Sequence, residues 1–420
     1  MKIRIRFDLS RIFARGARLT PTGIDRVDIR YAKMLLANND LFEFEGVVLH
    51  KGHFIFVPNN LAVEICNLVY GQWIDDSYFG LNHSDKVAAC LKKLADQIKT
   101  TSLIAGTKID VRLRSGVDTN PGVYINVTFA GLETTYDHAR YKSITGDKML
   151  YFIHDLLPLE YPEYFWKDWD KVHLQRILNM RAVADMIATV SNDVAVKLQE
   201  LFKHLKVEEN GIFAIQNGVE DTFVNYSVKA KAEYKPRNQF VIVSTIEPRK
   251  NHLMLLEIWR DFIFSGLSDI PKLIIIGSRG WHNSNTFEFL EKCTAIQPYI
   301  EEVHDVDDGE MIKHIFESKA TLFPSYGEGW GLPVVESMTL GVQAICSDIA
   351  VLRECSNNMA EYIEIQDKKK WLNEILRYSR MDDEESRLLH SHLGSFKPVI
   401  WCDSFVKLRH HLDMLAFSKN

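Results

Sequence analysis

The sequence predicts an α/β protein with two doubly wound, Rossmann-like domains that face each other across a cleft. From residue 240 onward, short apolar runs alternate with helical stretches: "FVIVSTI", "KLIIIGS", "ATLFPS" and "VQAICSD". Such runs are apolar on both faces, which is typical of parallel strands covered by helices on both sides. The first half repeats the theme with "IRIRFDLS", "FEFEGVVLH", "VYINV", "KMLYFIHD", "DMIATVS" and "IFAIQNG". A chain of 420 residues is long enough for two or three domains.

The boundaries follow from the helical periodicity and from one polar stretch. The predicted helices lie near residues 24–37, 85–99, 168–184, 192–204, 253–264 and 308–317. Residues 225–239 are polar and lysine-rich and contain a proline, which is typical of a linker. We therefore expect a first domain over 1–225, a linker over 226–239, a second domain over 240–395, and a helix over 396–420 that returns to the first domain. Doubly wound sheets bind ligands beyond the carboxyl ends of their strands, so the site is expected between the two domains.

Composition excludes several classes of protein. The net charge of −6 gives no reason to expect nucleic acid, and no apolar run approaches the roughly 18 residues of a membrane span. The start "MKIRIRFDLS" has the pattern of a strand and not of a signal peptide. The six cysteines are scattered without a C-x-x-C pair, which favours reduced thiols over disulfides or zinc. We expect a soluble, cytoplasmic protein.

The segment "GEGWGLPVVESMTLG" at residues 327–341 predicts an anion site. A strand ends before it, and a helix is expected to begin near Leu332, with Pro333 in its first turn and Gly341 at its end. The loop 327–331 then brings backbone N–H groups and a helix N-terminus to one point, which suits a phosphate or diphosphate.

Two acids and two bases complete this site. Glu328 and Glu336 would repel a phosphate, but they suit a ligand with sugar hydroxyls on either side of its phosphates. Arg249 and Lys250, in "STIEPRKNH", follow a strand of the same sheet and supply positive charge. The ligand so described is a nucleoside diphosphate sugar.

At this point residues 240–354 resemble the donor half of the retaining glycosyltransferases of family four, which have the GT-B fold. The matching segments are "EPRKNH", "IIIGSRGW", "DVDDGEM", "FPSYGEGWGLPVVESMTLG" and "CSDIAVLRE". The resemblance implies that Glu336 holds the ribose of the nucleotide. It also implies that Glu328 holds the transferred sugar together with the backbone of Gly329, Trp330, Gly331 and Leu332. Arg249 and Lys250 would hold the diphosphate.

The amino-terminal half carries further family segments. "TPTGIDRVDIRYAKML" resembles a glycine loop above the donor phosphates, which implies a role for Gly23 and Arg26. "YFIHDLLPLEYPEYF" matches the family's "HD" segment, so His154 is expected to face the cleft as a catalytic residue, although a histidine after a strand is often structural. "VSNDVAVKL" and "QNGV" match two positions at the cleft edge. Residues 51–120 match no pattern and are expected to handle the acceptor.

The family implies transfer with retention of configuration, in which the leaving phosphate accepts the proton of the acceptor. The expected donor is a nucleoside diphosphate sugar, with GDP-mannose favoured by resemblance to polysaccharide mannosyl- and rhamnosyltransferases. The expected acceptor is a polyprenyl-diphosphate-linked or growing glycan of an O-antigen or capsule. No cofactor and no metal are expected, because fixed cations and a helix end replace them. The acids of "DVDDG" suggest a metal site, but a turn at a helix N-terminus is the preferred interpretation.

Three other classes of function fit the sequence less well than a glycosyltransferase. A nicotinamide oxidoreductase needs G-x-G-x-x-G after a strand, and "GSRGWH" and "GEGWGL" both fail that spacing. A glycan phosphorylase needs a cofactor lysine environment that the sequence does not display. A non-catalytic nucleotide-sugar-binding subunit of a polysaccharide assembly complex is the alternative from a different class.

Residues 1–34 carry nine basic and three acidic side chains, so the rest of the chain is acidic. Only Ile3, Ile5 and Phe7 are expected to be buried in this stretch. The basic side chains then form a solvated face or, with equal weight, a peripheral contact with the anionic inner membrane or a lipid-diphosphate acceptor.

Overall fold

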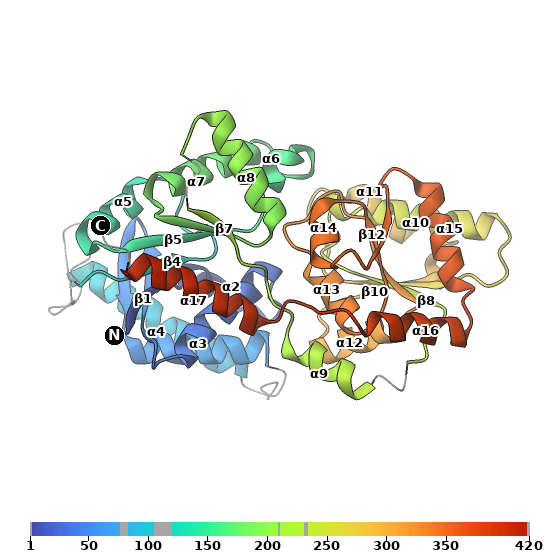
Figure 1. Ribbon diagram of the computed structural model, residues 1–420, viewed down its shortest axis with the longest axis horizontal. Helices are drawn as coiled ribbons and strands as arrows, with labels where there is room; N and C mark the ends of the chain where they lie inside the picture. Colours follow the sequence, from blue (N-terminus) through green and yellow to red (C-terminus); the bar gives the residue numbers. More distant parts are fainter. Residues whose placement is uncertain (1, 76–82, 105–119, 209–210, 231–233, 418–420) are drawn as a thin grey trace.

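The structure is a computed structural model that describes residues 2–75, 83–104, 120–208, 211–230 and 234–417. The chain forms two lobes side by side, each with one sheet between layers of helices (Figure 1). The predicted α/β class and the pair of mostly parallel sheets are confirmed. Residues 76–82 and 105–119, part of the segment expected to handle the acceptor, lie outside the described residues.

The first lobe is built on a seven-stranded sheet with the order β3-β2-β1-β4-β5-β6-β7. Its strands are β1 (Ile3–Asp8), β2 (Phe42–His50), β3 (His53–Val57), β4 (Val123–Asn126), β5 (Lys148–Ile153), β6 (Met186–Thr189) and β7 (Ile212–Ala214). All pairs are parallel except β2 with β3, which form a hairpin.

The second lobe is built on a six-stranded, all-parallel sheet with the order β10-β9-β8-β11-β12-β13. Its strands are β8 (Gln239–Val243), β9 (Lys272–Ile276), β10 (Ile300–Val303), β11 (Ala320–Phe323), β12 (Ala344–Ser347) and β13 (Glu361–Ile363). The central strands of each sheet are parallel, so their carboxyl ends lie at the same edge of the sheet. This is the edge where ligands bind in doubly wound folds.

Helices cover both faces of each sheet. In the first lobe these are α1 (Ser10–Arg15), α2 (Gly23–Ala37), α3 (Asn59–Trp73), α4 (His83–Ile104), α5 (Tyr136–Thr145), α6 (Leu157–Glu160), α7 (Trp169–Val183), α8 (Asn192–Leu205) and α17 (Trp401–Phe417). In the second they are α10 (His252–Phe264), α11 (Ser284–Lys292), α12 (Asp308–Phe316), α13 (Leu332–Thr339), α14 (Ala350–Cys355), α15 (Lys368–Ser379) and α16 (Asp383–Leu393). Short 3₁₀ turns η2 (Pro162–Tyr164), η3 (Pro248–Lys250) and η4 (Gln297–Tyr299) complete the elements.

Three strands, β3, β10 and β13, were not predicted from the sequence. All three lie at an end of their sheet, where one side of the strand has no neighbour. β10 reads "IEEV" and β13 reads "EYI", so neither has the apolar run that identifies a buried strand. The other strands were predicted because each has an apolar run, and such a run indicates a strand packed in a sheet.

The segment expected to be a linker begins as a helix. α9 (Asp221–Ala230) covers the first residues of that segment, so the predicted linker is helical where it begins. Phe223 is fully buried, and Val224 and Tyr226 pack against the core of the second lobe. Apolar side chains on one face of a polar, lysine-containing stretch make a helix that packs, which composition alone does not reveal.

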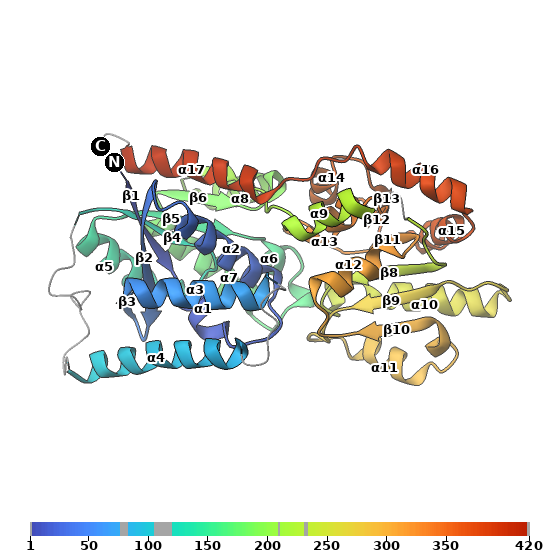
Figure 2. The same cartoon turned by 90° about the horizontal axis from the view of Figure 1, so that it is seen from below.

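The chain crosses between the lobes twice, and the two crossings run side by side. Val219 pairs with Ile400 as a parallel bridge, and α17 then packs along β1 and β4 of the first lobe (Figure 2). A Cβ atom on Gly218 would lie 2.2 Å from the backbone nitrogen of Trp401, so this close approach needs glycine. The "QNGV" segment therefore forms the crossing point.

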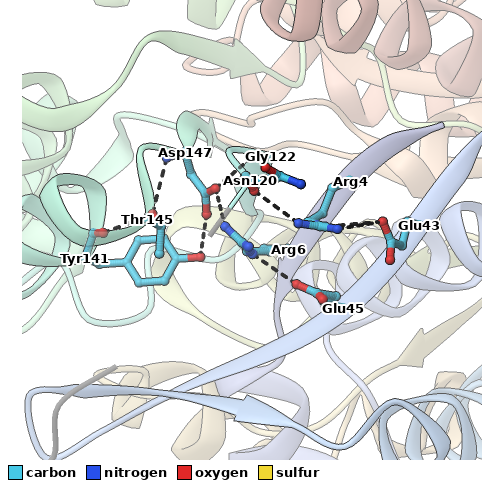
Figure 3. Close-up of polar contacts among 9 residues, drawn as sticks. All are labelled: Arg4, Arg6, Glu43, Glu45, Asn120, Gly122, Tyr141, Thr145 and Asp147. Atoms are coloured by element: carbon cyan, nitrogen blue, oxygen red, sulfur yellow. Dashed lines mark hydrogen bonds and ion pairs between the residues drawn. The ribbon is translucent and has the colours of Figure 1, made fainter. Parts of the chain in front are cut away.

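The basic residues of strand β1 do not all lie on a solvated face, which was one of the two expectations for this stretch. Arg6 is fully buried in the middle of β1, where its guanidinium pairs with Asp147 and with Glu45 at 3.0 Å (Figure 3). Asp147 also accepts hydrogen bonds from the backbone N–H of Gly122 at 2.8 Å and from the Tyr141 hydroxyl at 2.7 Å. The expectation that only apolar residues of this strand are buried is wrong, because a fully paired guanidinium can occupy a core position.

We expect Asp147→Ala to destabilise the protein by about 3–5 kcal/mol, because it leaves a buried guanidinium without its main partner. Glu43→Ala is the matched control, since it breaks the Arg4–Glu43 pair, in which Glu43 is half-exposed, and should cost about 0–1 kcal/mol. Urea unfolding followed by circular dichroism measures both changes. Equal small losses in the two variants would contradict the role given to the buried pair.

Candidate active site between the lobes

The loop 327–331, called here the glutamate loop, joins β11 to α13 as predicted. Gly331 has a φ of +101° and directly precedes Leu332, the first residue of the helix. A side chain at Gly331 would be strained in this conformation and would lie 2.9 Å from Leu352, so glycine is required. Pro333 lies in the first turn, where its missing N–H costs no hydrogen bond. The loop therefore ends at the N-terminus of α13.

The predicted cations lie directly against this loop. η3 carries Arg249 and Lys250 beyond the end of β8, and the Lys250 ammonium is 2.5 Å from Glu328 Oε1. Arg249 lies 3.1 Å from Glu328 Oε2 and 2.5 Å from Glu247 Oε1. It also donates to the carbonyl of Gly327. The structure thus brings these predicted residues together, and it adds Glu247, which the sequence analysis missed.

Charge is balanced within this cluster. Burial alone would raise the pKa of Glu328, but the charges of Lys250 and Arg249 outweigh it and lower that pKa to about 2. Burial and the neighbouring Arg249 lower the pKa of Lys250, and Glu328 opposes them. Two cations therefore face two carboxylates in this cluster.

Glu336 lies in a second buried cluster, one that joins the lobes. Arg26 of α2 reaches α12 and makes a two-pronged ion pair with Asp308, at 2.5 and 2.9 Å. Burial raises the pKa of Glu336 to about 8, and the charges of Asp308 and Glu220 add to this while Arg26 opposes it. Glu336 is therefore largely a neutral carboxylic acid at pH 7, able to donate as well as accept a hydrogen bond.

The acidic side chains of "DVDDG" each have a hydrogen-bond or ion-pair partner within the protein. Asp305 accepts a hydrogen bond from the Thr20 hydroxyl at 2.9 Å, and Asp307 caps α12 by accepting from the N–H of Glu310 at 2.7 Å. Asp308 is the partner of Arg26. Across the described ranges, no group of three or more histidine, cysteine, aspartate or glutamate side chains has the arrangement of a metal site.

The two lobes meet at Gly329. A Cβ atom there would lie 2.2 Å from the carbonyl oxygen of His154, so the backbones can approach only because this residue is glycine. The carbonyl of Gly329 accepts a hydrogen bond from the Ser191 hydroxyl at 2.8 Å. The family segments "HD" and "VSND" of the first lobe thus contact the glutamate loop of the second.

His154 is held in one protonation state. Its Nε2 lies 2.6 Å from the carbonyl oxygen of Val127, and a carbonyl only accepts, so Nε2 carries the proton. Burial lowers the pKa of His154, which favours the neutral ring. In that tautomer Nδ1 is the nitrogen that can accept a hydrogen bond.

The remaining predicted site residues have different surroundings. Gly23 is the first residue of α2, and a Cβ atom there would meet nothing within 4 Å, so no close approach requires this glycine. The Trp330 side chain is buried in the core of the second lobe, and its indole N–H has no partner among the residues that the structure describes. Leu332 is half-buried at the start of α13. Their expected contacts with a donor stay predictions.

Glu354 makes a contact between the two lobes that was not predicted from the sequence. From α14 of the second lobe it accepts hydrogen bonds from the backbone N–H of Asn192 at 3.0 Å and of Asp193 at 3.2 Å. It also accepts from Gln216 at 3.0 Å. A carboxylate at the N-terminus of α8 is favourable, and the "SND" segment that begins α8 was the available signal for such a partner.

Comparisons with known proteins agree with this arrangement. The glycosyl transferases group 1 family matches residues 226–387. The serotype-specific mannosyltransferase WbdA of Escherichia coli is 26% identical over 255 residues, which is 56% of this chain and 30% of that protein. The O-antigen chain mannosyltransferase RfbU of Salmonella typhimurium is 26% identical over 239 residues, which is 56% of this chain and 62% of that protein. The matched part is therefore less than two thirds of each of these relatives.

Solved structures match over nearly the whole chain. Anabaena HepE in complex with UDP and glucose has a TM-score of 0.58 and 13% identity, with 98% of this chain and 99% of that chain covered. The catalytic domain of starch synthase IV from Arabidopsis thaliana, bound to ADP and acarbose, has a TM-score of 0.58 and 11% identity, with 99% and 100% covered. Residues 226–387, which include the glutamate loop and its cations, match the glycosyl transferases group 1 family, and the chain as a whole has the GT-B fold.

Proposed function

We propose that the protein is a retaining glycosyltransferase of surface polysaccharide synthesis. It moves a sugar from a nucleoside diphosphate sugar to a lipid-linked or growing glycan of an O-antigen or capsule. The observation that carries this proposal is the cluster of Arg249 and Lys250 around Glu328, beside the N-terminus of α13. Cations and helix N–H groups at one point suit a leaving diphosphate, and the cluster lies inside the matched family segment.

The donor follows from the relatives. WbdA and RfbU are named mannosyltransferases, which supports GDP-mannose as the first donor to test. HepE is described in complex with UDP and glucose, so uridine nucleotides belong in the same test.

Each group has a role in this reaction. Glu336 holds the ribose, and Glu328 holds the transferred sugar together with the backbone of 329–332. The bond from the anomeric carbon to the phosphate oxygen breaks, and the acceptor oxygen bonds to that carbon on the same face. The departing phosphate takes the proton of the acceptor. Arg249 and Lys250 stabilise the charge that grows on the diphosphate, and Nδ1 of His154 accepts a hydrogen bond from a substrate hydroxyl.

We propose no cofactor and no metal for this reaction, because two fixed cations and a helix end face the leaving group. The partners are then the donor and the glycan acceptor, with no nucleic acid. No helix in the described part of the chain is long and apolar enough to cross a membrane.

A peripheral contact with the anionic inner membrane is a weaker part of the proposal. Of the basic residues near the amino terminus, Arg11 and Arg15 pair with Asp25, whereas Lys2 and Arg18 are exposed. Lys2 and Arg18 are therefore the side chains left for such a contact. Flotation with anionic liposomes at low salt tests it, and a protein that stays unbound would remove it.

The competing proposal is a nucleotide-sugar-binding subunit without activity. Both proposals predict donor binding, so turnover separates them. A catalyst releases nucleoside diphosphate in an acceptor-dependent manner, and a subunit does not.

We expect one nucleotide sugar to raise the melting temperature and to be turned over in EDTA. Saturation at 100 times Kd adds about 2.7 kcal/mol, which is several degrees for a lobe of this size. The screen uses GDP-mannose, UDP-sugars and dTDP-rhamnose. Loss of turnover in EDTA that Mg²⁺ or Mn²⁺ restores would overturn metal independence, and protection by no nucleotide sugar would overturn the function.

We expect Lys250→Ala and Arg249→Ala each to lower kcat by about 10²–10³, because each removes a donor aimed at the leaving group. Arg279→Ala is the control, because it removes a guanidinium that binds Glu291 and Glu302 near the surface of the same lobe. Melting temperatures are measured alongside, to separate lost activity from lost folding. A kcat near that of the parent in both cluster variants would remove the diphosphate role.

We expect stability to depend on pH through Glu336. Its pKa is about 8 in the folded protein, above the ordinary value, so its contribution is full at pH 4 and is lost as the pH rises to 8. Glu336→Gln removes this titration, so its melting temperature should fall less between pH 5 and pH 8, by about 2–4 °C per kcal/mol. Glu384→Gln, at an exposed position in α16, should follow the parent. Parallel pH profiles for all three proteins would contradict the buried, neutral state of Glu336.

A further inference from the structure

We propose that a cavity of about 530 Å³ in the first lobe binds a negatively charged group of the acceptor, a phosphate or a carboxylate. The inference rests on the proposed function and specifies one feature of its acceptor. The cavity lies where β2 and β4 end, and it is walled by α1, the hairpin turn after β2, and the loop after β4. Arg11, Arg15, Lys51, Thr128 and Arg176 are the lining residues on which the argument depends.

The basic wall of the cavity carries more charge than its nearest partner can balance. Arg11 and Arg15 lie one turn apart on α1, and both bond to the same oxygen of Asp25, at 2.7 and 2.9 Å. Asp25 is buried behind them and is held by the capping box of α2, so the position of its carboxylate is fixed. One carboxylate thus orients two guanidiniums; Arg11 also donates to the Thr22 hydroxyl at 3.2 Å, and each guanidinium keeps further N–H groups that can donate to an anion.

Lys51 adds a charge without a partner of its own. It lies at the tip of the β2–β3 hairpin with a φ of +48°, and no carboxylate is within 4.0 Å of its ammonium in the described ranges. On the opposite wall Arg176 is matched by Glu133 at 2.6 Å, whereas the Asp137 carboxylate lies against the hairpin turn at Gly52. The excess positive charge is therefore greatest on the side formed by α1, where Arg11 and Arg15 share one carboxylate.

The cavity wall also has a hydroxyl group with nothing to bind. Thr128 is 8% exposed, and its Oγ1 has no hydrogen-bond partner among the residues described. Buried hydroxyls in folded proteins are nearly always paired, and an unpaired one at a cavity wall is a candidate ligand contact.

The same wall adjoins the residue that holds His154. Thr128 follows Val127, whose carbonyl holds Nε2 of His154. Arg11 is near enough to His154 that its charge lowers the pKa of that ring, after the larger effect of burial. An acceptor that presents its hydroxyl to His154 therefore has room to place a phosphate or carboxylate against Arg11, Arg15 and Lys51.

The experiment measures anion binding with the donor site already filled. The protein is saturated with the nucleoside diphosphate that protects it best, and it is then titrated with octyl phosphate, glucuronate or neutral methyl mannoside. We expect one of the two anions to bind and methyl mannoside to bind at least about tenfold more weakly. Tighter binding of octyl phosphate identifies a phosphate group, and tighter binding of glucuronate identifies an acidic sugar.

Variants locate the binding in this cavity. Lys51→Ala breaks no ion pair of the described chain and should fold normally, and we expect it to weaken anion binding about tenfold. Arg15→Gln should do the same, because Arg11 still neutralises Asp25. Arg18→Ala, which removes an exposed basic residue of the same segment outside the cavity lining, should leave anion binding unchanged.

Two results would overturn the inference: neutral methyl mannoside binding as tightly as the anions, or equal anion binding by the parent, Lys51→Ala and Arg15→Gln. Failure of the proposed function looks different, because then no nucleotide sugar protects the protein. The anion titration is in that case repeated without nucleotide in the Lys250→Ala variant. Binding that depends on Lys51 supports the anion site even then.

Discussion

The contact of Gly329 with the carbonyl of His154 is the constraint on which the candidate site depends. It places the glutamate loop of one lobe against the end of β5 in the other, at a distance that no side chain at position 329 would allow. The cations, the helix N-terminus and the histidine become parts of one site only through this approach. The nearby hydrogen bond from Ser191 to the carbonyl of Gly329 holds the same pair of surfaces in register.

Opposite charges on the two lobes make this closed arrangement specific. Arg26 of the first lobe is paired with Asp308 of the second, and Glu354 of the second lobe caps the N-terminus of α8 in the first. An ion buried at an interface without its partner is costly, so each of these groups favours the arrangement in which its partner is present. Glu336 lies beside one of these pairs, and burial, with smaller contributions from Asp308 and Glu220, raises the pKa of its carboxyl group although Arg26 opposes this.

The same principle operates inside the first lobe. Arg6 lies in the middle of the central strand, and Asp147 and Glu45 satisfy its guanidinium. Arg11 and Arg15 share Asp25, which also caps α2. The amino-terminal basic residues are thus largely structural or turned toward a cavity, and their number in the sequence does not measure the charge of the outer surface.

The sequence by itself determined the α/β class, ten of the strands and the site segments of the second lobe. These features are local: apolar runs identify buried strands, and the glycines, the proline and the glutamates of residues 327–341 lie within a single turn and helix. It did not reveal the strands β3, β10 and β13, of which the last two lack apolar runs, or the helix α9, whose apolar face lies in a polar stretch. Only the tertiary structure decided that Arg26 meets Asp308, that Glu354 caps α8, that Arg6 is buried and that Arg11 and Arg15 line a cavity. These contacts join residues that are far apart in the chain. The sequence does not show whether a charged side chain is paired or solvated, because this depends on which residues the fold places next to it.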